Sequence, residues 1–312
     1  MAVRIKENKR IRQIDVDTEV YAVAINLSSL KLDVHSQGIN YEFLLGGNVN
    51  YRPVGDIDGD PVGDASCKVI AYRVEGDRIK IDTASDQSLT IKKSIILTFT
   101  PDHFTYTFTL TPTEDIVIQV VKYGAHADES GNECKRAATF EEVFIWCPDR
   151  YLPIIPFNQT TELKLSTRRI PYEDGSFFRG DVGKYVAPPY VVALRTGESW
   201  AGIAVLGIPQ SEFGEYLLVT RDDYILDFRY ANNKVGRAGE QMRFPQVGFF
   251  FAEQRDDILQ NYVNVVFESG LAIKPKTWAD WWAGPIYCSY ADQVYHHIIT
   301  SGIRKDESGA TA

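Results

Sequence analysis

The sequence contains little cysteine, and none of it is arranged to bind a metal. Four cysteines are spread through 312 residues, without a CxxC pair or a Cys/His run at zinc-finger spacing. We therefore expect free thiols in a reducing compartment and predict a cytoplasmic protein. The first residues lack an apolar h-region and no apolar run reaches about 18 residues, so neither a signal peptide nor a membrane span is expected.

Positive charge is in the minority. The chain has 33 Lys and Arg against 42 Asp and Glu, which gives a formal net charge of −9. A surface with this balance repels phosphate backbones, so we expect no nucleic-acid partner.

The short motifs that mark common active sites and metal sites are also missing. There is no GxSxG, P-loop or GxGxxG, and the five histidines form no HxH or HExxH. The acidic run Asp56–Asp60, followed by Asp64, resembles part of a calcium loop. However, Pro61 and Cys67 stand where an EF-hand has Gly and Glu. An acidic turn between strands is therefore favoured, and we expect neither a metal nor a cofactor.

The sequence does contain a period of two in its apolar residues, from about residue 18 to about residue 250. The clearest case is a hairpin predicted from Ile95–Thr100 and His103–Leu110, where apolar residues alternate with threonines. Many such runs follow one another without a helical period between them. The pattern predicts a mainly β fold, a large antiparallel β-sandwich, and a chain with 44% apolar residues can bury its core.

The apolar period changes after residue 254. From Ile258 to Val266 it becomes three and four, which predicts a helix with an Asp N-cap at Asp256-Asp257 and with Gly270 just past its end. We therefore predict a sandwich domain, a helix with a linker, and the start of a further domain, at 1–254, 255–280 and 281–312.

A stretch at 177–190 gathers aromatic and charged residues without strand periodicity. It contains Arg179, Asp181, Tyr185 and Tyr190. Aromatic loops on rigid sandwiches often bind ligands, sugars included, so these four are candidate sugar-binding residues. The alternative, that the aromatic side chains cover a sheet edge, is favoured.

The most specific stretch is Trp282 followed by Pro285–Tyr290. It resembles the W-x-x-P-I-Y-C-[ST]-W pattern at the first barrel strand of the α-galactosidase-like retaining glycoside hydrolases, with Tyr290 in place of the last Trp. The resemblance implies a galactose-mutarotase-like β-supersandwich, a helical linker and a (β/α)₈ barrel that hydrolyses glycosidic bonds with two carboxylates. It further implies that Cys288, Tyr290 and Asp292, at the end of that strand, belong to a sugar pocket. The alternative is that Cys288 is a core residue and Tyr290 packs on the linker.

The length limits what this resemblance implies. Only 28 residues follow Gly284, whereas a barrel needs about 200. Neither family carboxylate therefore falls on this chain. We predict the accessory domain of a glycoside hydrolase, inactive alone, whose barrel is truncated from the chain. The alternatives are a stand-alone carbohydrate-binding protein and an unrelated structural β-protein. The expected partners are carbohydrate and the catalytic barrel, and a homo-oligomer is left open.

Overall fold

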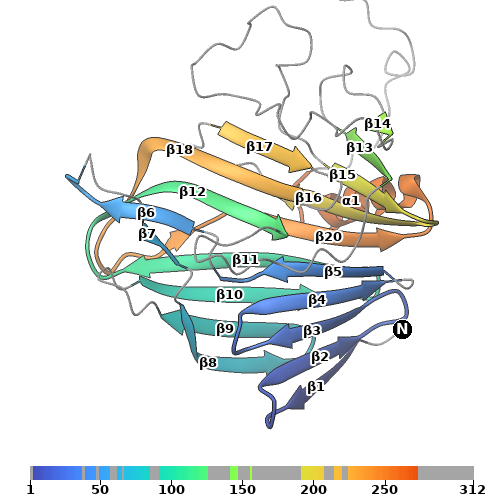
Figure 1. Cartoon of the computed structure of the whole chain (residues 1–312), viewed down its shortest axis with the longest axis horizontal. Coiled ribbons are helices and arrows are strands. Elements are labelled where there is room, and N and C mark those ends of the chain that lie inside the picture. The colour runs from blue at the N-terminus through green and yellow to red at the C-terminus, as the bar shows by residue number, and fades with distance from the viewer. Residues whose placement is uncertain are drawn as a thin grey trace, which may run out of the picture. The chain divides into compact units, whose positions relative to one another are not determined.

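The computed structural model describes most of the first 272 residues. These are residues 3–36, 39–46, 49–56, 62–64, 67–84, 91–125, 141–146, 155–156, 191–206, 214–219 and 224–272. Within these ranges the strands form two five-stranded sheets and one ten-stranded sheet (Figure 1). They belong to a compact unit that runs from Met1 to Leu271. The predicted large antiparallel β-sandwich is confirmed.

The first five-stranded sheet is a meander in which each strand pairs with the next, in the order β1-β2-β3-β4-β5. Its strands are β1 (Arg4–Asn8), β2 (Gln13–Asp17), β3 (Ala22–Asn26), β4 (Lys31–Ser36) and β5 (Ile39–Leu44). The sheet begins at Arg4, before the first strand that the period of two predicted. The edge strand β1 was not predicted because it is largely exposed and charged and shows no clear apolar alternation.

The second five-stranded sheet is assembled from segments far apart in the sequence, in the order β17-β18-β12-β6-β7. Its strands are β6 (Val49–Pro53), β7 (Val62–Gly63), β12 (Ile116–Ala125), β17 (Gly214–Val219) and β18 (Tyr224–Gly236). Because β12 contacts β5, the two five-stranded sheets lie beside each other.

The ten-stranded sheet has the order β14-β13-β15-β16-β20-β11-β10-β9-β8, with β19 also paired to β11. Its strands are β8 (Lys68–Glu75), β9 (Arg78–Ala84), β10 (Ile91–Phe99), β11 (His103–Pro112), β13 (Glu142–Trp146), β14 (Ile155–Pro156), β15 (Val191–Thr196), β16 (Ser199–Leu206), β19 (Met242–Arg243) and β20 (Gln246–Ala252). Strands β10 and β11 form the predicted hairpin, and Phe104, Tyr106, Phe108 and Leu110 share its buried face as expected.

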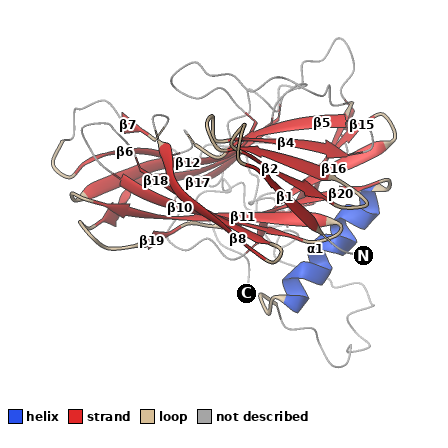
Figure 2. Cartoon of the chain, turned by 90° about the horizontal axis from the view of Figure 1, so that it is seen from below, coloured by secondary structure: helices blue, strands red, loops and turns tan. Residues whose placement is uncertain are grey.

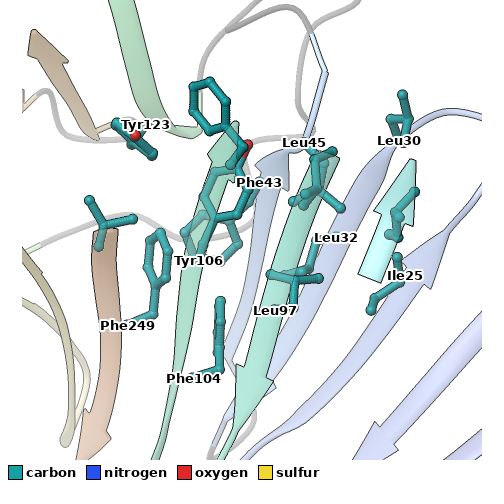
Figure 3. Close-up of a cluster of buried hydrophobic side chains, with 14 of the residues drawn as sticks. Ile25, Leu30, Leu32, Phe43, Leu45, Leu97, Phe104, Tyr106, Tyr123 and Phe249 are labelled. Atoms are coloured by element: carbon teal, nitrogen blue, oxygen red, sulfur yellow. The ribbon is translucent and has the colours of Figure 1, made fainter. Parts of the chain in front are cut away.

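The core lies between the ten-stranded sheet and the two smaller sheets. Side chains from all three sheets form one buried apolar cluster. Figure 3 shows part of it, where Phe43 of β5, Phe104 of β11 and Phe249 of β20 pack together. The Phe43 and Phe249 ring centroids lie 4.6 Å apart. A gap of only about 10 Å³ remains beside these rings, so the layers are closely packed.

The helix in the described part of the chain is α1 (Arg255–Glu268). Its position and its stop at Gly270, which has φ +73°, agree with the sequence. The predicted Asp N-cap is wrong, because Gln254 occupies that position without a side-chain cap. Asp256 and Asp257 instead lie in the first turn, where the helix dipole favours negative charge. Among the described residues, no helix is long and apolar enough to cross a membrane.

Candidate functional site

The site residues predicted from the sequence all fall outside the described residues. Arg179, Asp181, Tyr185 and Tyr190 lie in 157–190, and Cys288, Tyr290 and Asp292 lie in 273–312. Their roles stay predictions. The described part of the chain offers a different candidate, on the face of the ten-stranded sheet that points away from the sandwich core.

One half of that outer face is covered by α1. The helix contacts β15, β16 and β20, and Figure 2 shows it beside β16 and β20. Ile258 of α1 is fully buried in a small apolar cluster with Val191, Leu206 and Phe250. It sits against Gly202, where any side chain would collide with it. This half of the face is therefore closed to ligands.

The other half of the outer face carries an open hollow of about 460 Å³, over β8, β9, β10, β11 and β19. Eight of its ten lining residues have polar or cationic side chains. The lining residues are Arg73, Arg78, Lys80, Ser94, Ile96, Thr107, Thr109, Gln241, Arg243 and Phe244. We call it the cationic hollow. Its volume lies within the range of ligand sites in proteins, about 300–1,000 Å³.

Strand register sets the two walls of the cationic hollow. Arg73 of β8 is directly opposite Lys80 of β9, and Arg78 begins β9. The far wall carries Arg243 of β19, which pairs with Thr109 of β11. Because neighbouring strands lie about 4.8 Å apart, the three strand spacings from β9 to β19 place the walls roughly 14 Å apart.

Two of the four cations are neutralised by acids beside them. Arg73 Nε lies 3.0 Å from Glu75 Oε1, and Lys80 Nζ lies 3.1 Å from Asp82 Oδ1. Partial burial raises the pKa of Asp82, but the Ser94 hydroxyl and the Lys80 ammonium outweigh that effect and hold this pKa below its ordinary value. Arg78 and Arg243 have no acidic partner among the described residues. The cationic hollow therefore keeps two guanidinium groups available to an anion.

The floor of the cationic hollow consists of short side chains that point outward from β10 and β11. Ser94 pairs with Thr109 and Ile96 with Thr107 across the two strands. Gln241 Nε2 donates to Thr109 Oγ1 at 3.2 Å. Hydroxyl and amide groups of this kind both donate and accept hydrogen bonds, as sugar hydroxyls do.

A buried ion pair lies on the opposite face of the same sheet. Lys93 Nζ is 2.7 Å from Asp64 Oδ2 and donates to the Leu45 carbonyl oxygen at 2.9 Å, and both charged side chains are fully buried. Burial alone lowers the pKa of Lys93, but the Asp64 carboxylate outweighs it, so this pKa lies above its ordinary value. A charged, paired lysine is a poor nucleophile, and Asp64 is committed to this pair.

A polar cluster ends the β10–β11 hairpin. His103 Nδ1 lies 2.8 Å from both Asp102 Oδ1 and Thr100 Oγ1, and the His103 ring stacks on Phe250 at 5.1 Å. Tyr21 directly precedes β3, and its Oη donates to the His103 carbonyl oxygen at 2.6 Å. These hydrogen bonds hold the turn between β10 and β11. The described residues also contain no group of three or more His, Cys, Asp or Glu placed to bind a metal.

The sequence reasoning missed the cationic hollow, although part of its signal was present. Arg73, Arg78 and Lys80 flank the Glu75–Asp77 turn at positions that a hairpin brings onto one face. Arg243 could not be added from the sequence, because β19 reaches β11 from about 130 residues further along the chain.

Comparisons with known proteins give a likeness of fold only. No protein-family model and no curated protein matches the sequence. Among solved structures, α-N-acetylgalactosaminidase NagBb from Bifidobacterium bifidum, in complex with Gal-NHAc-DNJ, matches with TM-score 0.51 and 11% identity, over 82% of this chain and 39% of that chain. An α-galactosidase from Lactobacillus brevis matches with TM-score 0.50 and 8% identity, over 82% and 42%. A galactose mutarotase-like protein from Lactobacillus casei matches with TM-score 0.46 and 8% identity, over 77% and 100%.

This chain thus spans about two fifths of the length of the two glycosidases. The likeness extends over most of the described sandwich. The sandwich that the sequence resemblance implied is confirmed: the chain has a large antiparallel β-sandwich, and its fold is similar to part of the α-galactosidase from Lactobacillus brevis.

Proposed function

We propose that this chain is the non-catalytic sandwich domain of a glycoside hydrolase, which packs on a catalytic barrel and shapes its mouth. The observation that carries the proposal is the fold: 82% of this chain corresponds to 39% of an α-N-acetylgalactosaminidase and to 42% of an α-galactosidase. A likeness to part of each enzyme supports the role of one domain among others.

The sequence after the sandwich supports the same role. Trp282 and Pro285–Tyr290 resemble the first barrel strand of the α-galactosidase-like hydrolases. Under the proposal, Cys288, Tyr290 and Asp292 would border the sugar pocket of the complete enzyme. Carbohydrate and a catalytic barrel are the proposed partners, and a cytoplasmic location is part of the same proposal.

Two measurements test this role. The first is hydrolysis of aryl α-galactosides and aryl α-N-acetylgalactosaminides by the purified chain. We expect no turnover above a heat-denatured control, because the two catalytic carboxylates of the resembling family lie on later barrel strands. Turnover by the chain alone would contradict a non-catalytic role.

The second measurement is association with a barrel. The genome next to this coding sequence is searched for further βα units, and the encoded barrel is co-expressed with the tagged chain. We expect the two to elute together in size-exclusion chromatography, and Trp282→Ala to weaken the association. Trp278→Ala is the matched control, since Trp278 lies outside the resembling pattern. A barrel that does not associate, or two variants that behave alike, would argue against the proposal.

A further inference from the structure

The cationic hollow stands out against the charge of the whole chain. The protein has a formal net charge of −9, yet four cations line this hollow. Glu75 and Asp82 offset Arg73 and Lys80, and the guanidinium groups of Arg78 and Arg243 lack such partners among the described residues. An excess of positive charge within a concave, polar surface favours a ligand that carries negative charge.

The cations are placed for a ligand with more than one anionic group. Arg78 and Arg243 stand on opposite walls, roughly 14 Å apart across the sheet and four residues, roughly 13 Å, apart along the strands, so that their backbones are about 19 Å apart. Each guanidinium presents a planar fork of donors that matches a carboxylate. Between them, the side chains of Ser94, Thr107 and Thr109 offer hydroxyl groups.

Two other classes of anion fit this surface less well. A nucleic acid carries a high density of phosphates, and the acidic surface of the remaining chain would repel it. An acidic peptide that adds a strand needs a free sheet edge and would pair along β8, the last strand of the sheet, whereas Arg78 begins β9, which is paired on both sides, and Arg243 lies beyond β10 and β11. A short oligosaccharide requires neither condition.

We propose that the cationic hollow binds an oligosaccharide that contains uronic acids. Arg78 and Arg243 bind carboxylates of separate sugar units, and Ser94, Thr107, Thr109 and Gln241 hydrogen-bond the sugar hydroxyls between them. The choice of a carbohydrate rests on the proposed function, and the choice of an anionic one rests on the charges of the hollow.

The test is calorimetric titration of the complete chain with tetragalacturonate at low salt, where exposed charges are screened least. A neutral galactose tetrasaccharide is the ligand control. We expect the acidic sugar to bind at least about tenfold more tightly. Arg78→Gln and Arg243→Gln should each weaken its binding about tenfold or more, as expected for loss of a charged hydrogen-bonding group.

Two further variants make the result specific. Arg10→Gln removes the same charge from the exposed β1–β2 turn, outside the hollow, and should leave binding unchanged. Arg78→Lys keeps the charge but loses the fork, so its loss should be smaller than that of Arg78→Gln. Circular dichroism and thermal unfolding establish that each variant is folded before titration.

Several outcomes would overturn the proposal. They are no binding of tetragalacturonate to the folded chain, equal binding of the neutral sugar, or an equal loss in Arg10→Gln. Tighter binding of a sulfated, uronate-free tetrasaccharide would assign the hollow to sulfate esters instead. The titrations need only this chain, so their failure is distinguishable from a failure to associate with a barrel.

Discussion

The two halves of the outer face of the ten-stranded sheet show how one sheet serves two purposes. Over β15, β16 and β20 the outward side chains are apolar, and α1 covers them. Over β8 to β11 the outward side chains are cations and hydroxyls, and they line an open hollow. The strands of the covered half are therefore apolar on both faces, while those of the open half keep the alternation of a sheet with one wet face.

This difference shows that the outward side chains of the sheet are buried where α1 covers them, and that the sheet alone does not bury them. The inner face is mainly apolar along both halves, and it encloses the Lys93–Asp64 ion pair. Three substitutions, one on the inner face, one under the helix and one at the hairpin end, sharpen the distinction between these environments.

The largest effect is expected on the inner face. Lys93→Met leaves the fully buried Asp64 carboxylate without its partner, and we expect the free energy of unfolding to fall by about 3–5 kcal/mol. Lys92→Met is the matched control, because the neighbouring Lys92 is exposed on the other face, and it should change stability by about 0.5 kcal/mol or less. Urea denaturation measures both.

A double variant tests the cause. Asp64→Asn added to Lys93→Met should recover part of the loss, since no unpaired charge remains and an amide oxygen can still accept from the Val49 N–H. Equal stability of Lys93→Met and Lys92→Met would show that the pair contributes nothing.

The next effect is expected under the helix. Ile258→Ala removes a fully buried side chain from the contact between α1 and β16 and should destabilise the protein by about 3 kcal/mol. Gln260→Ala, on the exposed side of the same helix, should stay within about 0.5 kcal/mol. If the two variants unfold at the same urea concentration, α1 does not depend on this contact.

The smallest effect is expected at the hairpin end and depends on pH. The hydrogen bond with His103 holds the pKa of Asp102 below its ordinary value, so the native state favours the carboxylate. Its contribution to stability is present above about pH 4, the ordinary value for Asp, and is lost as the pH falls through the lower folded value.

Asp102→Asn should therefore lower the melting temperature slightly near neutral pH, by little because Asp102 is 44% exposed, and the difference from the parent protein should shrink below about pH 4. Asp77→Asn, in the neighbouring β8–β9 turn, serves as the control. A difference that grows as the pH falls would refute this assignment.

Much of the fold was predictable because it depends on local alternation. The Thr and aromatic residues of His103–Leu110 specified both the strand and its buried face, and the spacing from Ile258 to Val266 specified the helix. The charged edge strand β1 carried too little apolar pattern to be recognised, and the N-cap of α1 depends on a backbone geometry that composition does not reveal.

The candidate site was predictable only in part. The sequence contained Arg73, Arg78 and Lys80 around one turn, but it gave no reason to prefer them to other surface cations. The residues chosen from the sequence lie outside the described part of the chain, so they neither support nor weaken the cationic hollow.

The sequence by itself determined that this chain builds a large β-sandwich followed by a helix, because the periods of two and of three to four act over neighbouring residues. Only the tertiary structure decided which strands from distant parts of the sequence became neighbours. It brought β19 to β11, and so Arg243 to the hollow, and it laid α1 over one half of the sheet while leaving the other half open. Pairings between distant segments are selected by the packing of the whole core, which no local pattern encodes.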